Sequence, residues 1–275
     1  MTAVPLHRAA AALLCVAACP ALAQPHAEDP NSTAALARAV QNPVANMSSL
    51  PFQNNTNLDA GPRKHTQNIL NIQPVVPFSL NSDWNLITRT ILPVMSQPGM
   101  MPGQGTSFGL GATQFTAFLS PARPTDGLIW GAGPIIQVPT TTDQALGSNI
   151  WGAGPSAVAL TMRGPWVIGA LVNNVWSFGG ARHNSYNTFT TQPFINYNFP
   201  HSPGTYLSSS PIITSNWMAR SGQQWTVPVG LALGQVFRVS GQAVNAQLGA
   251  YYNVVRPDDA ASWQIRFQVS FLFPR

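Results

Sequence analysis

One spacing in the sequence could support nucleophilic catalysis, His183-Asn184-Ser185. In that arrangement the histidine would take the proton of the serine nucleophile, as in ester hydrolysis, provided that a third group orients the imidazole. Asn184 and Asn187 are the nearby side chains that could do so, but no motif places them for that task. We therefore predict no catalytic residue and keep hydrolysis by His183 and Ser185 as an alternative.

Other residues with catalytic or ligating chemistry are scarce and dispersed. The acids all fall in the N-terminal tail or between predicted strands: Glu28, Asp29, Asp59, Asp83, Asp126, Asp143, Asp258 and Asp259. The histidines have no metal-ligand spacing: His7, His26, His65, His183 and His201. We therefore expect no acid–base carboxylate pair, no metal site and no cofactor.

Three arginines, Arg89, Arg238 and Arg266, lie on the polar faces of predicted strands that carry no acid. Tyr251 lies on a similar face. If these faces line a pore, unpaired arginines favour anions there. The alternative is that the arginines bond to neighbouring Gln and Asn side chains, or to a plug made by residues 24–46.

The elements that must position these residues are strands. From Met47 onward, apolar and polar residues alternate in about twelve segments separated by Gly, Pro, Ser, Asn and Asp clusters. Their expected spans are 47–57, 66–78, 84–95, 106–118, 127–138, 149–162, 166–178, 187–198, 205–217, 225–238, 243–254 and 263–273.

The alternation is clearest in the last segment. One face carries Trp263, Ile265, Phe267, Val269, Phe271 and Phe273, and the other carries Gln264, Arg266, Gln268 and Ser270. Residues 225–238 and 243–254 follow the same pattern. Successive strand residues point to opposite sides, so one face would meet lipid and the other a polar lumen.

Composition distinguishes this barrel from a soluble β-sandwich, which also alternates. Only 8% of residues are charged while 45% are hydrophobic, and the polar faces carry mainly uncharged side chains. A sandwich would be expected to place many charges on its solvent face. No run of the mature chain reaches the roughly 20 apolar residues of a membrane helix. We therefore predict an all-β protein, a transmembrane antiparallel up-and-down barrel of about twelve strands.

The tryptophans support this prediction because they fall near predicted strand ends. Trp84, Trp130 and Trp166 would lie at one rim, and Trp151, Trp176, Trp217, Trp225 and Trp263 at the other. Indole rings favour the membrane interface, so all eight are expected to be interface anchors.

The N-terminus is typical of an exported protein. Residues 1–23 contain the apolar run Ala9–Ala18 and a small-x-small site at Ala21-Leu22-Ala23, which predicts a signal peptide cleaved after Ala23. The alternative is lipidation at Cys19. Residues 24–46 would form a periplasmic or lumen-directed extension, with Asn31 or Ser32 capping a short helix over 34–40, or else a flexible tail. Residues 47–275 would form the barrel.

Two further features concern the barrel wall. Ile129–Pro134 (IWGAGP) recurs as Ile150–Pro155, and a Pro within a strand predicts an irregular ladder. The connections at 163–165 and 239–242 are short, whereas those at 96–105, 139–148 and 255–262 are longer and would be extracellular.

Five segments carry a family resemblance: Pro51–Asn55, Asn71–Pro77, Asp83–Arg89, Gly154–Ala157 and Arg266–Pro274. Over residues 33–275 the chain resembles Gram-negative outer-membrane proteins often mislabelled "neuromedin U", which are related to outer-membrane proteins of phenol meta-cleavage pathways. The resemblance implies a barrel with a transporter-like role and no established substrate. Barrels of this kind usually end on an aromatic residue, whereas Pro274 and Arg275 follow Phe273 here.

We therefore predict a porin-like channel of the bacterial outer membrane for passive permeation of small solutes, anionic or aromatic. An outer-membrane phospholipase using His183 and Ser185, and a structural or adhesive barrel, are the alternatives. The expected partners are outer-membrane lipid, the barrel-assembly machinery and an unidentified solute. Nucleic acid is not expected, because the net charge is only +5 and no Lys/Arg cluster occurs.

Overall fold

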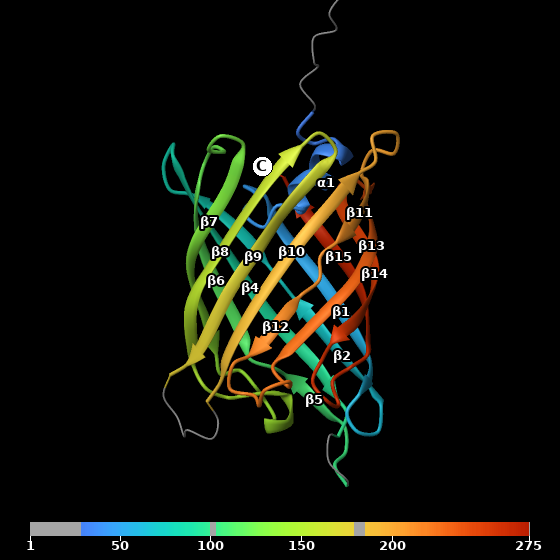
Figure 1. Cartoon of the computed structure of the whole chain (residues 1–275). Coiled ribbons are helices and arrows are strands. Elements are labelled where there is room, and N and C mark those ends of the chain that lie inside the picture. Colours follow the sequence, from blue (N-terminus) through green and yellow to red (C-terminus); the bar gives the residue numbers. More distant parts are fainter. Residues whose placement is uncertain (1–28, 100–102, 179–184, 275) are drawn as a thin grey trace, which may run out of the picture.

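The computed structural model describes residues 29–99, 103–178 and 185–274, which form a single 15-stranded sheet with one short α-helix (Figure 1). The predicted signal peptide, with Cys15 and Cys19, lies outside the described residues, as do Glu28 and His183. Among the described residues, no helix is long and apolar enough to cross a membrane.

The elements follow one another around the sheet with few departures from chain order. They are α1 (Thr33–Val40), β1 (Ser48–Ala60), β2 (His65–Ile72), β3 (Val75–Ser79), β4 (Trp84–Gln97), β5 (Ser107–Leu110), β6 (Thr113–Pro121), β7 (Leu128–Val138), the 3₁₀ turn η1 (Gln144–Leu146), β8 (Gly152–Arg163), β9 (Trp166–Ser177), β10 (Asn187–Asn198), β11 (Thr205–Ser209), β12 (Ile213–Asn216), β13 (Trp225–Val239), β14 (Gln242–Val255) and β15 (Trp263–Phe273).

The fifteen strands occupy twelve positions in the wall. β2 and β3 both pair with β1 and β4, and β11 and β12 both pair with β10 and β13. β5 and β6 both pair with β4. The fold is thus a closed 12-strand antiparallel barrel. The prediction of an all-β, up-and-down barrel is confirmed, and each expected segment corresponds to one wall position.

Closure of the barrel comes from the first and last strands. β1 pairs with β15 along its length, from Ser48 opposite Phe273 to Leu58 opposite Trp263. The remaining pairings run from β1 through β4 and β9 to β14 without a free edge. A sheet closed in this way leaves no row of unpaired backbone groups facing lipid.

Two of the three interrupted positions contain a proline at the break. Pro74 separates β2 from β3, and Pro211 lies between β11 and β12. Because proline has no N–H, it cannot continue the ladder at that point. The backbone repairs the first break locally, since Gln73 N donates to Pro51 O (2.9 Å) and Thr90 N donates to Pro74 O (3.1 Å).

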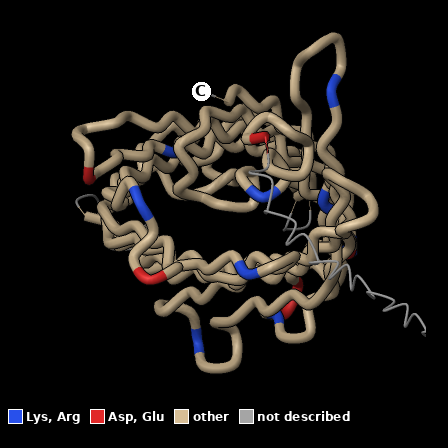
Figure 2. Tube along the Cα trace, turned by 90° about the horizontal axis from the view of Figure 1, so that it is seen from above, with Lys and Arg blue, Asp and Glu red and all other residues tan. Residues whose placement is uncertain are grey.

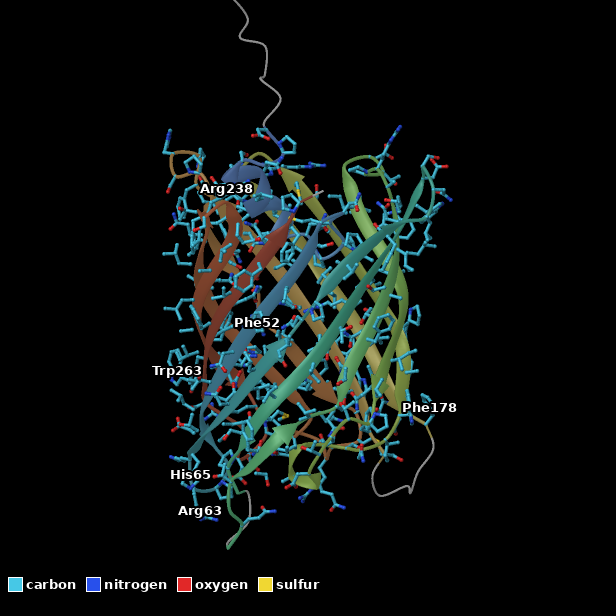
Figure 3. All side chains as sticks on the ribbon, turned by 180° about the vertical axis from the view of Figure 1, so that it is seen from behind. Phe52, Arg63, His65, Phe178, Arg238 and Trp263 are labelled. Carbon is cyan, nitrogen blue, oxygen red and sulfur yellow. The ribbon has the colours of Figure 1, made fainter. Side chains whose placement is uncertain are left out.

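The two faces of β13 to β15 separate as the alternation predicts. Leu231, Leu248 and Phe267 point outward and are 56%, 58% and 48% exposed, whereas Tyr251 and Arg266 point inward and are 0% and 2% exposed. Figure 3 shows side chains on both sides of the wall, with Phe52 at mid-height on the outer face. The exposed apolar outer surface is consistent with a bacterial outer membrane.

The repeated IWGAGP segments form an irregular patch in the wall, as predicted. Pro134 of β7 lies opposite Pro155 of β8, and the ladders to β6 and β9 both skip residues beside this pair. Gly133 and Gly154 approach the adjacent strands closely, because a Cβ on either would lie within 1.8 Å of a backbone oxygen. The outer side of this patch is a shallow apolar groove.

The lumen is only partly polar, which the alternation does not predict. Inward-facing side chains of the β4 to β10 wall, together with Val44 from the segment after α1, form an apolar cluster, the wall cluster: Val44, Ile87, Phe118, Val158, Leu160, Val167, Leu171 and Phe194. A second set, the helix cluster, packs α1 against the opposite wall: Leu36, Ala37, Met47, Tyr206, Val236, Ala243 and Leu272. These clusters make the lumen a packed interior at the end of the barrel that holds α1.

The helix α1 confirms the element expected over 34–40. Ser32 caps it, since the Ser32 Oγ accepts a hydrogen bond from Ala35 N (3.1 Å). Viewed down the barrel axis, the chain forms a ring with part of the N-terminal region inside it (Figure 2). We call the end of the barrel that holds α1 the helix end and the opposite end the loop end.

The connections sort between these ends as expected. The short turns 164–165 and 240–241 lie at the helix end (Figure 1). The longer connections 139–151 and 256–262 lie at the loop end, as do residues 98–99 and 103–106 of the connection between β4 and β5. At the loop end the connection 139–151 is tied down by Tyr186, whose hydroxyl donates to Ile150 O (3.2 Å). Burial raises the pKa of Tyr186 to about 12.

The tryptophans also occupy the two ends that were predicted. Trp84, Trp130 and Trp166 lie near the helix end, where Trp84 and Trp130 are in edge-on contact with ring centroids 6.0 Å apart. Trp151, Trp176, Trp217, Trp225 and Trp263 lie near the loop end, and Figure 3 shows Trp263 toward that end. Their role as membrane-interface anchors stays a prediction.

We expect Leu248→Lys to lower the free energy of unfolding by about 2–4 kcal/mol, because it places a charge on the outer face near the middle of β14. The measurement is urea-induced unfolding of the refolded protein in lipid vesicles. The neighbouring lumen-facing change Gln247→Lys is the matched control and should cost much less. Equal losses for the two variants would contradict the assignment of the outer face to lipid.

Candidate functional site

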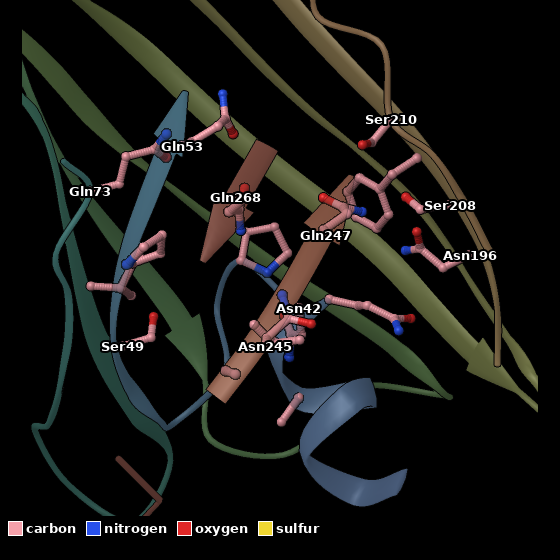
Figure 4. Close-up of a pocket in the computed structure, with 18 of the residues that line it drawn as sticks. Asn42, Ser49, Gln53, Gln73, Asn196, Ser208, Ser210, Asn245, Gln247 and Gln268 are labelled. Atoms are coloured by element: carbon pink, nitrogen blue, oxygen red, sulfur yellow. The ribbon is translucent and has the colours of Figure 1, made fainter. Parts of the chain in front are cut away.

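The candidate site is a cavity of about 160 Å³ inside the barrel. It lies between the segment that follows α1 and the inner faces of several strands (Figure 4). Its polar lining consists of Gln41, Asn42, Ser49, Gln53, Gln73, Arg89, Gln192, Asn196, Tyr206, Ser208, Ser210, Asn245, Gln247, Arg266 and Gln268. Primary amides dominate this lining, and Figure 4 shows the labelled amides arranged around a common space.

The apolar part of the lining comes from two directions. Ala39, Val40, Pro43, Ala45 and Met47 belong to the N-terminal segment, and Pro51, Val75, Leu171 and Phe194 belong to the wall. The cavity therefore offers hydrogen-bonding groups on one side and apolar surface on another.

The segment 39–47 closes the cavity toward the helix end. Gln41 and Asn198 exchange two side-chain hydrogen bonds of 2.9 and 3.2 Å. Arg38 Nη1 donates to Gly164 O (2.6 Å), and Val44 inserts into the wall cluster. The N-terminal segment thus lies inside the lumen and is held by contacts with several strands.

Arg266 is held by lumen side chains, which was the alternative to a free pore charge. Its Nε donates to Asn55 Oδ1 (3.2 Å), its Nη1 to Ser210 O (2.9 Å) and its Nη2 to Gln264 Oε1 (2.8 Å). The guanidinium also lies 4.5 Å from the centroid of the Tyr251 ring. These contacts occupy all three of its nitrogens and make Arg266 a structural residue of the wall.

Tyr251 is therefore placed differently from expectation. It faces inward as predicted, but it is fully buried beneath Arg266 and does not line the cavity. Its hydroxyl lies 3.5 Å from Ser210 Oγ. The alternation predicts its direction, whereas its burial depends on which side chain of the next strand covers it.

Arg238 lies at the helix-end rim and not in the cavity (Figure 3). Its Nη1 donates to Gly241 O (2.9 Å) and its Nη2 to Asn31 O (2.8 Å). The exposed guanidinium thus ties the start of α1 to the turn between β13 and β14. The sequence predicts Arg238 on a lumen face but not its height along the axis, and the structure places it near the end of β13, away from the cavity.

Of the three predicted arginines, Arg89 has the guanidinium with the fewest hydrogen bonds to the protein and is the most available to a solute. It is half-buried, lines the cavity from β4 and donates from Nη2 to Gln73 Oε1 (2.6 Å). Within the described residues no other hydrogen-bond partner of its guanidinium is found. A guanidinium has five N–H donors, so most of its donors remain available to a solute.

The electrostatics of the cavity follow from the placement of the acids. No acid among the described residues lines it, so within that part of the chain its two guanidiniums have no carboxylate partner there. The described acids lie in the tail, turns and strand ends, as predicted: Asp29, Asp59, Asp83, Asp126, Asp143, Asp258 and Asp259. Figure 2 shows how few charged positions the ring carries. The cavity is therefore positive.

A chain of amides beside the cavity was not predicted. Arg266 donates to Gln264, Gln264 to Asn57 Oδ1 (3.0 Å), Asn57 to Gln67 Oε1 (2.7 Å) and Gln67 to Gln97. It crosses β15, β1, β2 and β4 toward the loop end. Alternation places each amide on the inner face, but only the strand register brings them into contact.

Of the two residues in the catalytic alternative, the structure describes only the serine. Ser185 lies in the connection just before β10, and His183 is outside the described residues. Among the residues that the structure covers, no group of three His, Cys, Asp or Glu side chains is placed to hold a metal ion.

No protein-family model and no curated protein matches the sequence. Solved structures do. The chain is similar to the COG4313 outer membrane channel from Pseudomonas putida F1, with a TM-score of 0.62 and 19% identity over 82% of this chain and 94% of that chain. A Pseudomonas aeruginosa FadL homologue matches with a TM-score of 0.44 and 12% identity, covering 89% and 93% of the two chains. Outer membrane phospholipase A from Escherichia coli matches with a TM-score of 0.42 and 13% identity, covering 88% and 98%.

These similarities show a fold, that of Gram-negative outer-membrane β-barrels. The FadL homologue and the phospholipase are too distant in structure to argue for either function. The resemblance to the "neuromedin U" group stays a prediction, since no sequence family is assigned.

We expect Arg266→Gln to lower the free energy of unfolding by about 2–4 kcal/mol, because it removes a buried charge from three acceptors. Arg89→Gln, which loses a single hydrogen bond, should cost about 1 kcal/mol or less. Both are measured by denaturant unfolding in detergent micelles. If Arg89→Gln were the more damaging variant, the assignment of Arg266 as structural and Arg89 as available would be wrong.

Proposed function

We propose that the protein is an outer-membrane channel for passive permeation of small solutes, with a preference for anions. The observation that carries the proposal is the lumen cavity, which is lined by amides, hydroxyls and two guanidiniums and, within the described parts of the chain, by no acid. Amides and hydroxyls replace part of the hydration shell of a passing solute, and the unneutralised guanidiniums favour negative charge.

The location in the outer membrane is supported by the outer face of the barrel. Four outward-facing side chains are more than half exposed: Val229, Leu231, Leu233 and Leu248. Exposing so many apolar side chains to water is unfavourable, whereas lipid contacts would bury them. Lipid is therefore a proposed partner, together with the machinery that inserts such barrels. The fold similarity to a protein described as an outer membrane channel agrees with this proposal.

The N-terminal segment is the proposed restriction of the channel. Residues 39–47 line the cavity on the helix-end side, and α1 packs into the helix cluster beyond them. A segment that is held by the wall without being part of it narrows the path while leaving the barrel closed. The proposed domain division follows, with an extension up to residue 46 and the barrel from residue 47.

Two alternative functions, a phospholipase and a structural or adhesive barrel, can be distinguished from a channel by experiment. A phospholipase-type enzyme requires a base for Ser185, and detergent-solubilised protein would then release fatty acid from phospholipid in a manner lost in Ser185→Ala. A structural or adhesive barrel would conduct no solute before or after removal of the N-terminal segment.

We expect deletion of residues 24–46 from the mature protein to raise single-channel conductance in planar bilayers several-fold. The deletion removes the groups that close the cavity on the helix-end side. Heat-modifiable migration on gels checks that the shortened barrel still folds. A folded deletion variant with unchanged conductance would show that this segment does not restrict the path.

We expect the wild-type channel to prefer Cl⁻ to K⁺ and Arg89→Gln to reduce that preference. The measurement is the reversal potential in a KCl gradient. Arg163→Gln is the matched control, because it removes the same charge from an exposed position at the end of β8 and should leave the preference unchanged. An equal response in both variants, or cation preference in the wild type, would sink the assignment.

A further inference from the structure

The two guanidiniums of the cavity differ in the hydrogen bonds they already make. Arg266 uses all three nitrogens on wall groups and stacks on Tyr251. Arg89 makes one side-chain hydrogen bond, through Nη2, to Gln73. Arg89 lines the same cavity, and among the described residues its Nε and Nη1 have no hydrogen-bond partner, so a solute there would meet a guanidinium with available donors.

Gln73 holds the bonded side of Arg89 in place. Gln73 is 5% exposed, and its backbone N donates to Pro51 O (2.9 Å) in the neighbouring strand β1. An arginine oriented by one fixed acceptor presents its remaining donors in a planar fork that matches the two oxygens of a carboxylate. The fork is thus preorganised for a carboxylate group.

The surroundings of Arg89 also specify the rest of the ligand. Val75 is its register partner across the β3–β4 ladder, and Val75 packs against the wall cluster that contains Leu171 and Phe194. Val75, Leu171 and Phe194 all line the cavity. A ligand whose carboxylate contacts Arg89 would therefore place its other end beside apolar surface.

The size of the cavity limits that ligand. At about 160 Å³ it is similar in volume to an engineered protein cavity of about 150 Å³ that holds benzene. A single small ring or a short aliphatic chain fits such a space. Arg266 is less available to a second carboxylate, because it already makes three hydrogen bonds, is 2% exposed and lies over the Tyr251 ring.

We propose that Arg89 is the anion-binding group of a lumen site for small monocarboxylates with an apolar body. The inference rests on the proposed channel function, because such a solute must enter the lumen. Gln73 acts as a positioning residue through its hydrogen bond to Arg89. The apolar wall at Val75, Leu171 and Phe194 selects against fully hydrophilic anions of the same charge.

Benzoate is the probe, and its neutral amide, benzamide, is the matched control of the same shape. Binding of each to the purified barrel in detergent is measured by isothermal titration calorimetry. We expect benzoate to bind more tightly than benzamide, and Arg89→Gln to weaken benzoate binding about tenfold or more, as expected for loss of a charged hydrogen bond. Arg89→Lys should restore part of the affinity, and Arg163→Gln should leave it unchanged.

Equal binding of benzoate and benzamide, or benzoate binding that Arg89→Gln leaves intact, would overturn the site. Calorimetry does not depend on conduction, so the two proposals fail separately. A barrel that binds benzoate through Arg89 but conducts no ions retains the site and refutes the channel. A conducting barrel with no Arg89-dependent benzoate binding retains the channel and refutes the site.

Discussion

Backbone hydrogen bonding in a medium without water is the constraint on which the rest of this structure depends. An N–H or C=O left unpaired in lipid costs several kcal/mol, so the sheet must close on itself. The pairing of β1 with β15 meets that requirement, and it brings Asn55 of the first strand beside Arg266 of the last. Even the breaks at Pro74 and Pro211 occur where the chain continues in the same wall position. Closure then determines which side chains share the interior.

Closure also determines what fills the interior, because the side chains that point inward must either pack together or hydrogen-bond to one another. This barrel uses two solutions side by side. Near the helix end, apolar residues such as Ile87 and Val236 pack around α1 and the segment after it. Toward the loop end, amides bond to one another and to Arg266 across four strands. The cavity lies where these regions meet, which is why it has both polar and apolar walls.

Alternation along the sequence predicts much of this fold and less of the site. The number of wall positions, the lipid-facing side of β15 and the Ser32 cap of α1 all follow from local patterns. A face, however, says nothing about height along the axis or about partners across the lumen. The alternation predicts that Arg238 and Arg266 both point inward. Arg238, however, bonds to Asn31 at the rim, whereas Arg266 is enclosed by acceptors of the wall. The alternation places Val236 on the inner face, but its contact there with α1 joins segments far apart in sequence and does not follow from the pattern.

The placement of α1 bears on the order in which the protein acquires its structure. Three hydrogen bonds hold the N-terminal region: Arg38 to Gly164, Gln41 to Asn198, and Arg238 to Asn31. The two residues of each pair are separated in sequence by 126, 157 and 207 positions, respectively. The helix also packs on Leu272, in the last strand. These partners lie on the middle and the final strands of the barrel. The earliest-synthesised part of the described chain therefore completes its contacts only when the last strand is in place, because Leu272 belongs to β15.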